Sequence, residues 1–150
     1  MSLSQADSDR ERYPAPVIEM SLAARESVSI VQADLDASRL GQYKMQLVRA
    51  GGTDTDPSIV AALPDGRFWG GSSITVNHMG TEVRSVLRTV AGSVQDTLGE
   101  VERVIWPRCA KHQNRLAVAE PSPDSPEGWP VWWCDGMGGH VLALIGHLRY

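Results

Sequence analysis

The sequence predicts an α+β fold with an N-terminal helix and β-hairpin, a long amphipathic helix, and a C-terminal three-stranded antiparallel sheet. Two observations predict it. Apolar residues recur at steps of three and four over 82–104, and three strand-like segments separated by turn residues follow within 105–150. Because 150 residues, 42% of them hydrophobic, suffice for one core, we expect a single compact unit.

Residues 1–16 are predicted to form a disordered arm, because they mix serine, proline and charged residues with almost nothing to bury. The arm lacks the apolar centre of a signal peptide, and no run approaches the roughly 20 apolar residues of a membrane span. We therefore expect a cytoplasmic protein without a membrane segment. The net charge of −4 argues against wholesale binding to nucleic acids or anionic membranes, although a local basic patch remains compatible with it.

The region 17–104 supplies the first α+β part of the expected unit. Residues 28–31 suit a short strand, whereas apolar residues nearer to helical spacing predict a helix over about 34–50, with Gly51-Gly52 as its stop. Residues 59–69 then form an apolar run, a Pro-Asp-Gly turn and a second apolar run, which predicts a β-hairpin.

The helix predicted over 82–104 has the clearest pattern in the chain. Thr81 is the expected N-cap, and Pro107 sets the latest possible stop. A stripe at this spacing indicates one face packed on a core, so its residues receive no functional role. The stripe consists of Val83, Val86, Leu87, Val90, Ala91, Val94, Leu98 and Val101.

After the helix, 105–150 is expected to form the zinc-ribbon-like module. Strands are predicted at 115–120, 129–134 and 140–146, joined as an antiparallel meander. The first connection is a long proline-rich loop, and the second, at 135–139, contains three glycines that can adopt positive φ.

Cys109, His112, Cys134 and His140 form the pattern Cys-x2-His, a gap of 21 residues, then Cys-x5-His. The turn before the first strand, the end of the second and the start of the third lie at the same end of an antiparallel meander, so we expect the four side chains to meet. Two cysteines and two histidines match the tetrahedral coordination of Zn²⁺. Four protein ligands leave no open position, which predicts a structural ion rather than a catalytic one.

Other interpretations of these residues remain open at this point. The two cysteines can also be inert buried thiols, or a disulfide or redox pair, although lasting disulfides are rare in a reducing compartment. His140 is the least secure ligand, because His78 or His147 can replace it in space.

Tryptophan and basic residues are also concentrated in this module. Most of its tryptophans should be core, but Trp132 and Trp133, being adjacent in a strand, must point to opposite faces. One face then lies on the long helix and the other on a second segment or a partner. The predicted partner-binding residues are Trp129, Trp132, Trp133, Arg108, Lys111 and Arg115.

The segments Ile105 to His112, Trp132 to Cys134 and His140 to Leu148 carry a resemblance to a known group of proteins. They resemble the C-terminal module of small uncharacterised proteins of high-GC actinobacteria, in which Trp-Pro-x-Cys-x-x-His is followed by Val-Trp-x-Cys and an apolar strand. The resemblance covers roughly Val90 to Leu148 and implies a bacterial cytoplasmic protein without an assigned reaction. This chain departs from the pattern in its long proline-rich loop and in Ala110, where proline is common.

Catalysis is not indicated by any motif. The sequence lacks a Gly-x-Ser-x-Gly elbow, a phosphate-binding loop with lysine and a His-Glu-x-x-His helix. The preferred hypothesis is a non-catalytic interaction or adaptor protein that binds a protein partner or a second copy of itself. The alternative is a nucleic-acid-binding protein that uses the basic residues around Cys109.

Overall fold

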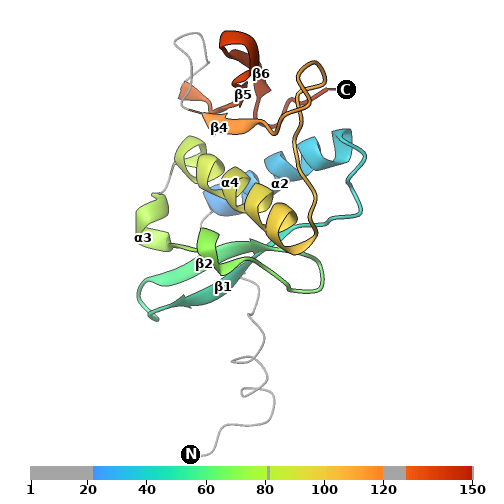
Figure 1. Ribbon diagram of the computed structural model, residues 1–150. Coiled ribbons are helices and arrows are strands. Elements are labelled where there is room, and N and C mark those ends of the chain that lie inside the picture. Colours follow the sequence, from blue (N-terminus) through green and yellow to red (C-terminus); the bar gives the residue numbers. More distant parts are fainter. Residues whose placement is uncertain (1–21, 81, 120–127, 150) are drawn as a thin grey trace, which may run out of the picture.

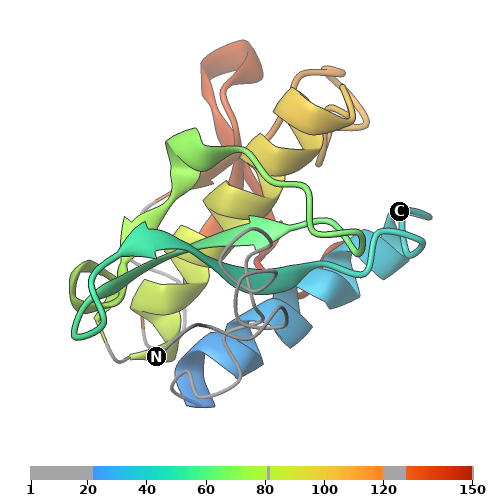
Figure 2. The same ribbon diagram turned by 90° about the horizontal axis from the view of Figure 1, so that it is seen from below.

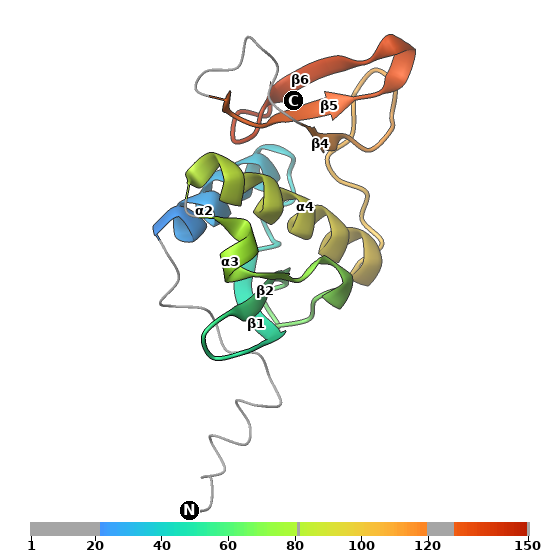
Figure 3. The same cartoon turned by 90° about the vertical axis from the view of Figure 1, so that its left-hand side faces the viewer.

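The structure, a computed structural model, describes residues 22–80, 82–119 and 128–149. The predicted arm and almost all of the proline-rich loop lie outside these residues. Two helices lie between two three-stranded antiparallel sheets, so that the described part of the chain has three layers (Figures 1 and 3). The predicted α+β class is confirmed.

The N-terminal helix exists but lies earlier than predicted. It is α2 (Leu22–Ala37), and it includes the residues that suit a strand at 28–31. Two of the side chains on its core face are polar, because Ser27 and Asp34 are buried there beside Leu35. These polar residues interrupt the apolar stripe, which explains why the pattern did not reveal the helix.

The second half of the predicted helix over 34–50 is wrong, because that segment enters strand β1 (Gln46–Gly52). Strand β1 pairs with β2 (Pro57–Ala62), which pairs with the short β3 (Ile74–Thr75) in the order β1-β2-β3. Both faces of β1 are covered: Leu47 packs on the main core, whereas Val48 belongs to a second buried cluster. A strand covered on both faces shows no alternation of apolar and polar residues.

The hairpin predicted over 59–69 is partly confirmed. Its first strand and its turn form, and Gly66 N donates to the Leu63 carbonyl at 2.8 Å. The returning residues make only an isolated bridge between Ala62 and Phe68, because the backbone N–H and carbonyl of Ala61 are bonded to the Ser93 and Thr97 hydroxyls.

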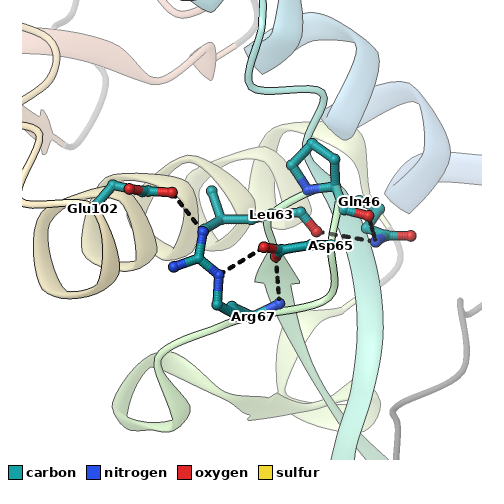
Figure 4. A network of polar contacts seen from close by, with 6 residues as sticks. Gln46, Leu63, Asp65, Arg67 and Glu102 are labelled. Atoms are coloured by element: carbon teal, nitrogen blue, oxygen red, sulfur yellow. Dashed lines mark hydrogen bonds and ion pairs between the residues drawn. The ribbon is translucent and has the colours of Figure 1, made fainter.

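Polar contacts fix the hairpin turn to the rest of the layer (Figure 4). The Arg67 guanidinium contacts the carboxylates of Asp65 at 2.7 Å and Glu102 at 2.6 Å. Gln46 donates from β1 to the Leu63 carbonyl at 3.1 Å. The turn is therefore held both to β1 and to the residue that follows the long helix.

The long helix is α4 (Val83–Val101), slightly shorter than predicted and ending before Pro107 as expected. Its N-cap is Glu82, and the expected cap Thr81 lies outside the described residues. Before it come a 3-10 turn, η1 (Gly70–Ser72), and the short α3 (Val76–Met79). The predicted stripe faces the interior, and Figure 2 shows β1 and β2 lying across α2 and α4.

The C-terminal sheet has the predicted order and direction. It consists of β4 (Ala117–Ala119), β5 (Val131–Cys134) and β6 (His140–Leu144), all antiparallel, in the order β4-β5-β6. A 3-10 turn, η3 (Gly136–Gly138), connects β5 to β6. One buried cluster continues from α2 through α4 into this sheet, so the sheet shares its core with the helices.

Candidate metal centre

Four side chains from three parts of the C-terminal module converge at one end of the β4-β5-β6 sheet. Cys109 and His112 lie on the loop before β4, Cys134 ends β5 and His140 begins β6. Their ligand atoms all lie within 4.8 Å of one another, close enough to hold a metal ion. Both cysteines are buried, and both histidines are half-buried.

The loop that carries Cys109 and His112 is a tight turn closed by its own backbone, and we call residues 108–115 the knuckle. Gln113 N donates to the Cys109 carbonyl at 2.7 Å, and Cys109 N donates to the Asn114 carbonyl at 3.0 Å. Gln113 has a positive φ of 62°, which turns the chain back so that Arg108 and Arg115 form an antiparallel bridge. The turn places the cysteine sulfur and the imidazole on the same side.

The separations between donor atoms show which ring nitrogen each histidine presents. His112 Nδ1 lies 3.5 Å from Cys109 Sγ and 3.3 Å from Cys134 Sγ. His140 presents Nε2, which lies 3.7 Å from Cys109 Sγ. His112 Nε2 is buried, and it has no hydrogen-bond partner within the described residues. A metal ion bound at Nδ1 would leave the proton of the neutral ring on Nε2.

Polar groups around the two sulfurs favour their role as ligands. Gly136 N donates to Cys134 Sγ at 3.4 Å. Backbone N–H groups of His112 and, to a lesser extent, Lys111 lower the pKa of the Cys109 thiol, while burial opposes part of that shift. A lowered pKa favours the thiolate, which is the form that binds metals.

The loop between β5 and β6 fits closely around His112. A Cβ atom added at Gly136 would lie 2.6 Å from His112 Cγ, so glycine is needed for the close approach. Asn114 Nδ2 donates to Asp135 Oδ1 at 2.7 Å, which ties the knuckle to the residue before that loop. The centre is thus enclosed by both segments that supply its ligands.

A buried glutamine on α4 holds the knuckle on the helix layer. Gln95 Nε2 donates to the Leu116 carbonyl at 2.6 Å and to the Trp106 carbonyl at 3.2 Å, on either side of the knuckle. Gln95 is only 2% exposed. Gln95 lies between positions of the apolar stripe, and the spacing of that stripe does not indicate that it faces inward.

The structure resolves the open choice of the fourth side chain. His140 belongs to the cluster, whereas His78 and His147 are exposed and lie outside it. Cys109 and Cys134 are free cysteines. All four predicted ligand residues are therefore brought together.

The predicted partner-binding residues fall into three groups. Trp132 was wrongly included, because it is fully buried and its indole N–H donates to Asp34 Oδ2. Trp129 and Trp133 are half-buried, and Trp129 donates to the Ile145 carbonyl at 2.8 Å. The basic residues of the knuckle are exposed, and they are Arg108, Lys111 and Arg115.

No protein-family model, curated protein or solved structure matches this chain. The resemblance to actinobacterial proteins therefore stays a prediction. Among the described residues, none of the helices combines the length and the apolar composition needed to cross a membrane.

Proposed function

We propose that this chain is a non-catalytic interaction protein whose C-terminal sheet is fixed by a structural zinc ion. The observation that carries the proposal is the geometry of the sulfur and nitrogen atoms. With Zn–S near 2.3 Å and Zn–N near 2.0–2.1 Å, a sulfur and a nitrogen at two corners of a tetrahedron lie roughly 3.6 Å apart. Three of the four sulfur–nitrogen separations are 3.3, 3.5 and 3.7 Å, and all four ligand atoms lie within 4.8 Å of one another.

The donor set supports zinc over harder cations. Two thiolates and two imidazoles suit zinc, whereas magnesium and calcium prefer oxygen ligands. Four protein ligands fill a tetrahedral shell, so water has no place at the ion. The proposed ion is therefore structural, and it would join the knuckle to the β5–β6 turn.

Substitution of cobalt for zinc tests the site directly. Full-length protein loaded with Co²⁺ should show the intense visible absorption of a tetrahedral ion and sulfur-to-metal charge-transfer bands. Cys134→Ser should weaken the charge-transfer bands. Asp135→Asn, which changes the neighbouring residue, is the control and should retain them. Weak octahedral absorption with no charge transfer would contradict a tetrahedral site with two sulfurs.

The outer face of the C-terminal sheet is the proposed recognition surface. The register pairs Trp133 with Ala117 on one side and with Val141 on the other, which forms an apolar row across all three strands. Ala117 and Val141 are exposed, Val141 by 41%, and Trp133 is half-buried. A large aromatic side chain in an apolar row is the kind of group that anchors protein interfaces. We propose a protein partner for this face.

A photo-crosslinking amino acid at Val141 tests this surface, with the same amino acid at the exposed α4 residue Glu100 as the control. A specific crosslinked partner is expected from position 141, and Trp133→Ala should abolish it. Equal products from both positions would contradict recognition at this face. Crosslinks between two copies of the chain would show that this face mediates self-association and does not bind a different protein.

Nucleic-acid binding is a second candidate, because the three exposed basic residues of the knuckle lie together. Arg108 and Arg115 are cross-strand neighbours. However, Arg115 lies 3.6 Å from the Asp96 carboxylate, which reduces its positive potential. Titration with single-stranded and duplex oligonucleotides at two salt concentrations tests it. Salt-sensitive binding that Arg108→Glu with Lys111→Glu abolishes would favour it over the protein partner.

A further inference from the structure

A groove of about 610 Å³ lies between the end of α2 and the segment that follows α4. It is separate from the four metal-ligating residues, and it has a size common for small-ligand sites. Figures 1 and 2 show α2 and α4 running in the same general direction, so that their C-terminal ends lie on the same side of the molecule.

Both helices end at this groove in a left-handed turn. After α2, Leu40 N donates to the Leu35 carbonyl at 2.9 Å and Arg39 N donates to the Asp36 carbonyl at 3.3 Å. These two bonds form the Schellman arrangement, in which the residue after the cap takes a left-handed conformation and is usually glycine. After α4, Val104 N instead donates to the Leu98 carbonyl, six residues earlier, at 3.0 Å.

Arginine occupies that left-handed position in both helices. Arg39 has φ 61° and Arg103 has φ 57°. A side chain in this region costs free energy that glycine would avoid. Both arginines line the groove, and the residues that follow them, Leu40 and Val104, line it as well. The repeated motif thus supplies a cation and an apolar side chain from each helix.

Three arginines and no carboxylate line the groove, and the arginines are Arg39, Arg103 and Arg108. Neither Arg39 nor Arg103 makes an ion pair or a side-chain hydrogen bond within the described residues. The two helix C-termini contribute about half a negative charge each, which together offset about one of the two positive charges of Arg39 and Arg103.

The rest of the lining is apolar except for Ser38. Trp106 is 2% exposed, and its indole N–H donates to Ser38 Oγ at 2.9 Å, so its polar group is already satisfied. Its ring also packs edge-on against Trp132, with centroids 5.3 Å apart. Ile105, by contrast, is 49% exposed at the same groove. The groove therefore offers apolar surface beside the guanidinium groups of Arg39 and Arg103.

We propose that this groove binds a small organic oxyanion, a carboxylate or a phosphate monoester attached to an apolar group. Arg39 and Arg103 bind the oxyanion through charge-assisted hydrogen bonds, and Leu40, Val104 and Ile105 contact the apolar group. Guanidinium groups bind both kinds of oxyanion in the same bidentate manner, so the probes must distinguish them.

Four probes separate the contributions in NMR chemical-shift titrations of the full-length protein: octyl phosphate, octanoate, 1-octanol and inorganic phosphate. Octyl phosphate or octanoate should shift the amide signals of residues 37–40 and 103–108. The octyl compound with the higher affinity identifies the preferred oxyanion. The neutral alcohol and inorganic phosphate should each bind at least about tenfold more weakly, because each lacks one of the two recognised groups.

The double variant Arg39→Gly with Arg103→Gly is the sharpest test, because glycine is the preferred residue at both positions and the helix ends should be preserved. It should weaken binding of the preferred probe at least about tenfold. The control Arg84→Ala with Arg88→Ala removes the same charge from α4 outside the groove and should leave affinity unchanged. Unchanged affinity in the glycine variant, equal binding of 1-octanol, or no binding at millimolar concentrations would overturn the proposal.

Discussion

Trp132 Nε1 donates a hydrogen bond to Asp34 Oδ2 at 2.8 Å, which joins the middle strand of the C-terminal sheet to the first helix. The same carboxylate accepts bonds from Gly146 N at 2.6 Å and from Leu148 N at 2.9 Å. Asp34 is 1% exposed, so it is a buried polar anchor for the end of the chain. The four candidate ligand residues thus belong to a module that contacts both α2 and α4.

Asp34→Asn should destabilise the protein by about 1–3 kcal/mol, because an amide cannot accept all three bonds and one N–H donor is left facing another. Denaturant unfolding measures the loss. Asp36→Asn on the exposed side of the same helix is the matched control and should change stability by less than about 0.5 kcal/mol. Equal effects of the two changes would show that the buried network contributes nothing.

Asp34 should also titrate above the ordinary carboxyl range. Burial raises its pKa from 3.8, and the hydrogen bonds from Trp132, Gly146 and Leu148 oppose the shift only in part. Because the folded chain binds this proton more tightly than the unfolded chain, protonation favours folding. That contribution is complete below 3.8 and is lost as pH rises through the raised value. A ¹³C NMR titration of the Asp34 carboxyl carbon checks it, and a midpoint at or below 3.8 would refute it.

Gly136→Ala should weaken metal binding by about 10–100-fold, since the added methyl group displaces His112 from the centre. A competition titration with a chromogenic chelator measures the affinity. Gly92→Ala is the control, because a Cβ atom there meets nothing within 4 Å. Gly92→Ala should leave metal affinity unchanged and stabilise α4 by up to about 1 kcal/mol. Similar affinities for both variants would contradict the close packing of Gly136 on His112.

Gln95→Met removes both hydrogen bonds that hold the ends of the knuckle while keeping the size of the side chain. We expect a loss of about 1–3 kcal/mol, because two buried carbonyls lose their donor. Hydrogen exchange should also become faster in the knuckle amides. Gln42→Met, at an exposed position, is the matched control. Unchanged exchange in the Gln95 variant would mean that the helix does not order the knuckle.

The sequence predicted the C-terminal module far better than the N-terminal region. Its ligand residues stand next to turns, and an antiparallel meander has few ways to arrange its ends, so Cys109 and Cys134 could be placed at one edge. The first helix was misplaced because Ser27 and Asp34 are polar residues on its core face. The partners of Asp34 are distant along the chain, and the Ser27 hydroxyl donates to the Ala23 carbonyl one turn earlier, so a pattern of apolar residues reveals neither burial.

The roles of Gln95 and of the two arginines at the helix ends were equally hidden. The role of Gln95 depends on the carbonyls that it contacts, and the role of the arginines depends on the groove that they line. Both are determined only by the packing of α2, α4 and the C-terminal sheet. Trp132 was assigned to the surface because alternation alone cannot say which of two adjacent tryptophans faces the core.

Metal content tests the central claim most directly. The full-length protein, purified without added metal, should contain one zinc ion per chain by inductively coupled plasma mass spectrometry. Cys109→Ser and Cys134→Ser should lose that zinc, and chelation should lower the wild-type melting temperature. Free zinc at about 1,000 times its dissociation constant stabilises the folded state by about 4 kcal/mol. A zinc-to-protein ratio near zero, with a melting temperature that chelators and added zinc leave unchanged, would contradict a structural zinc site.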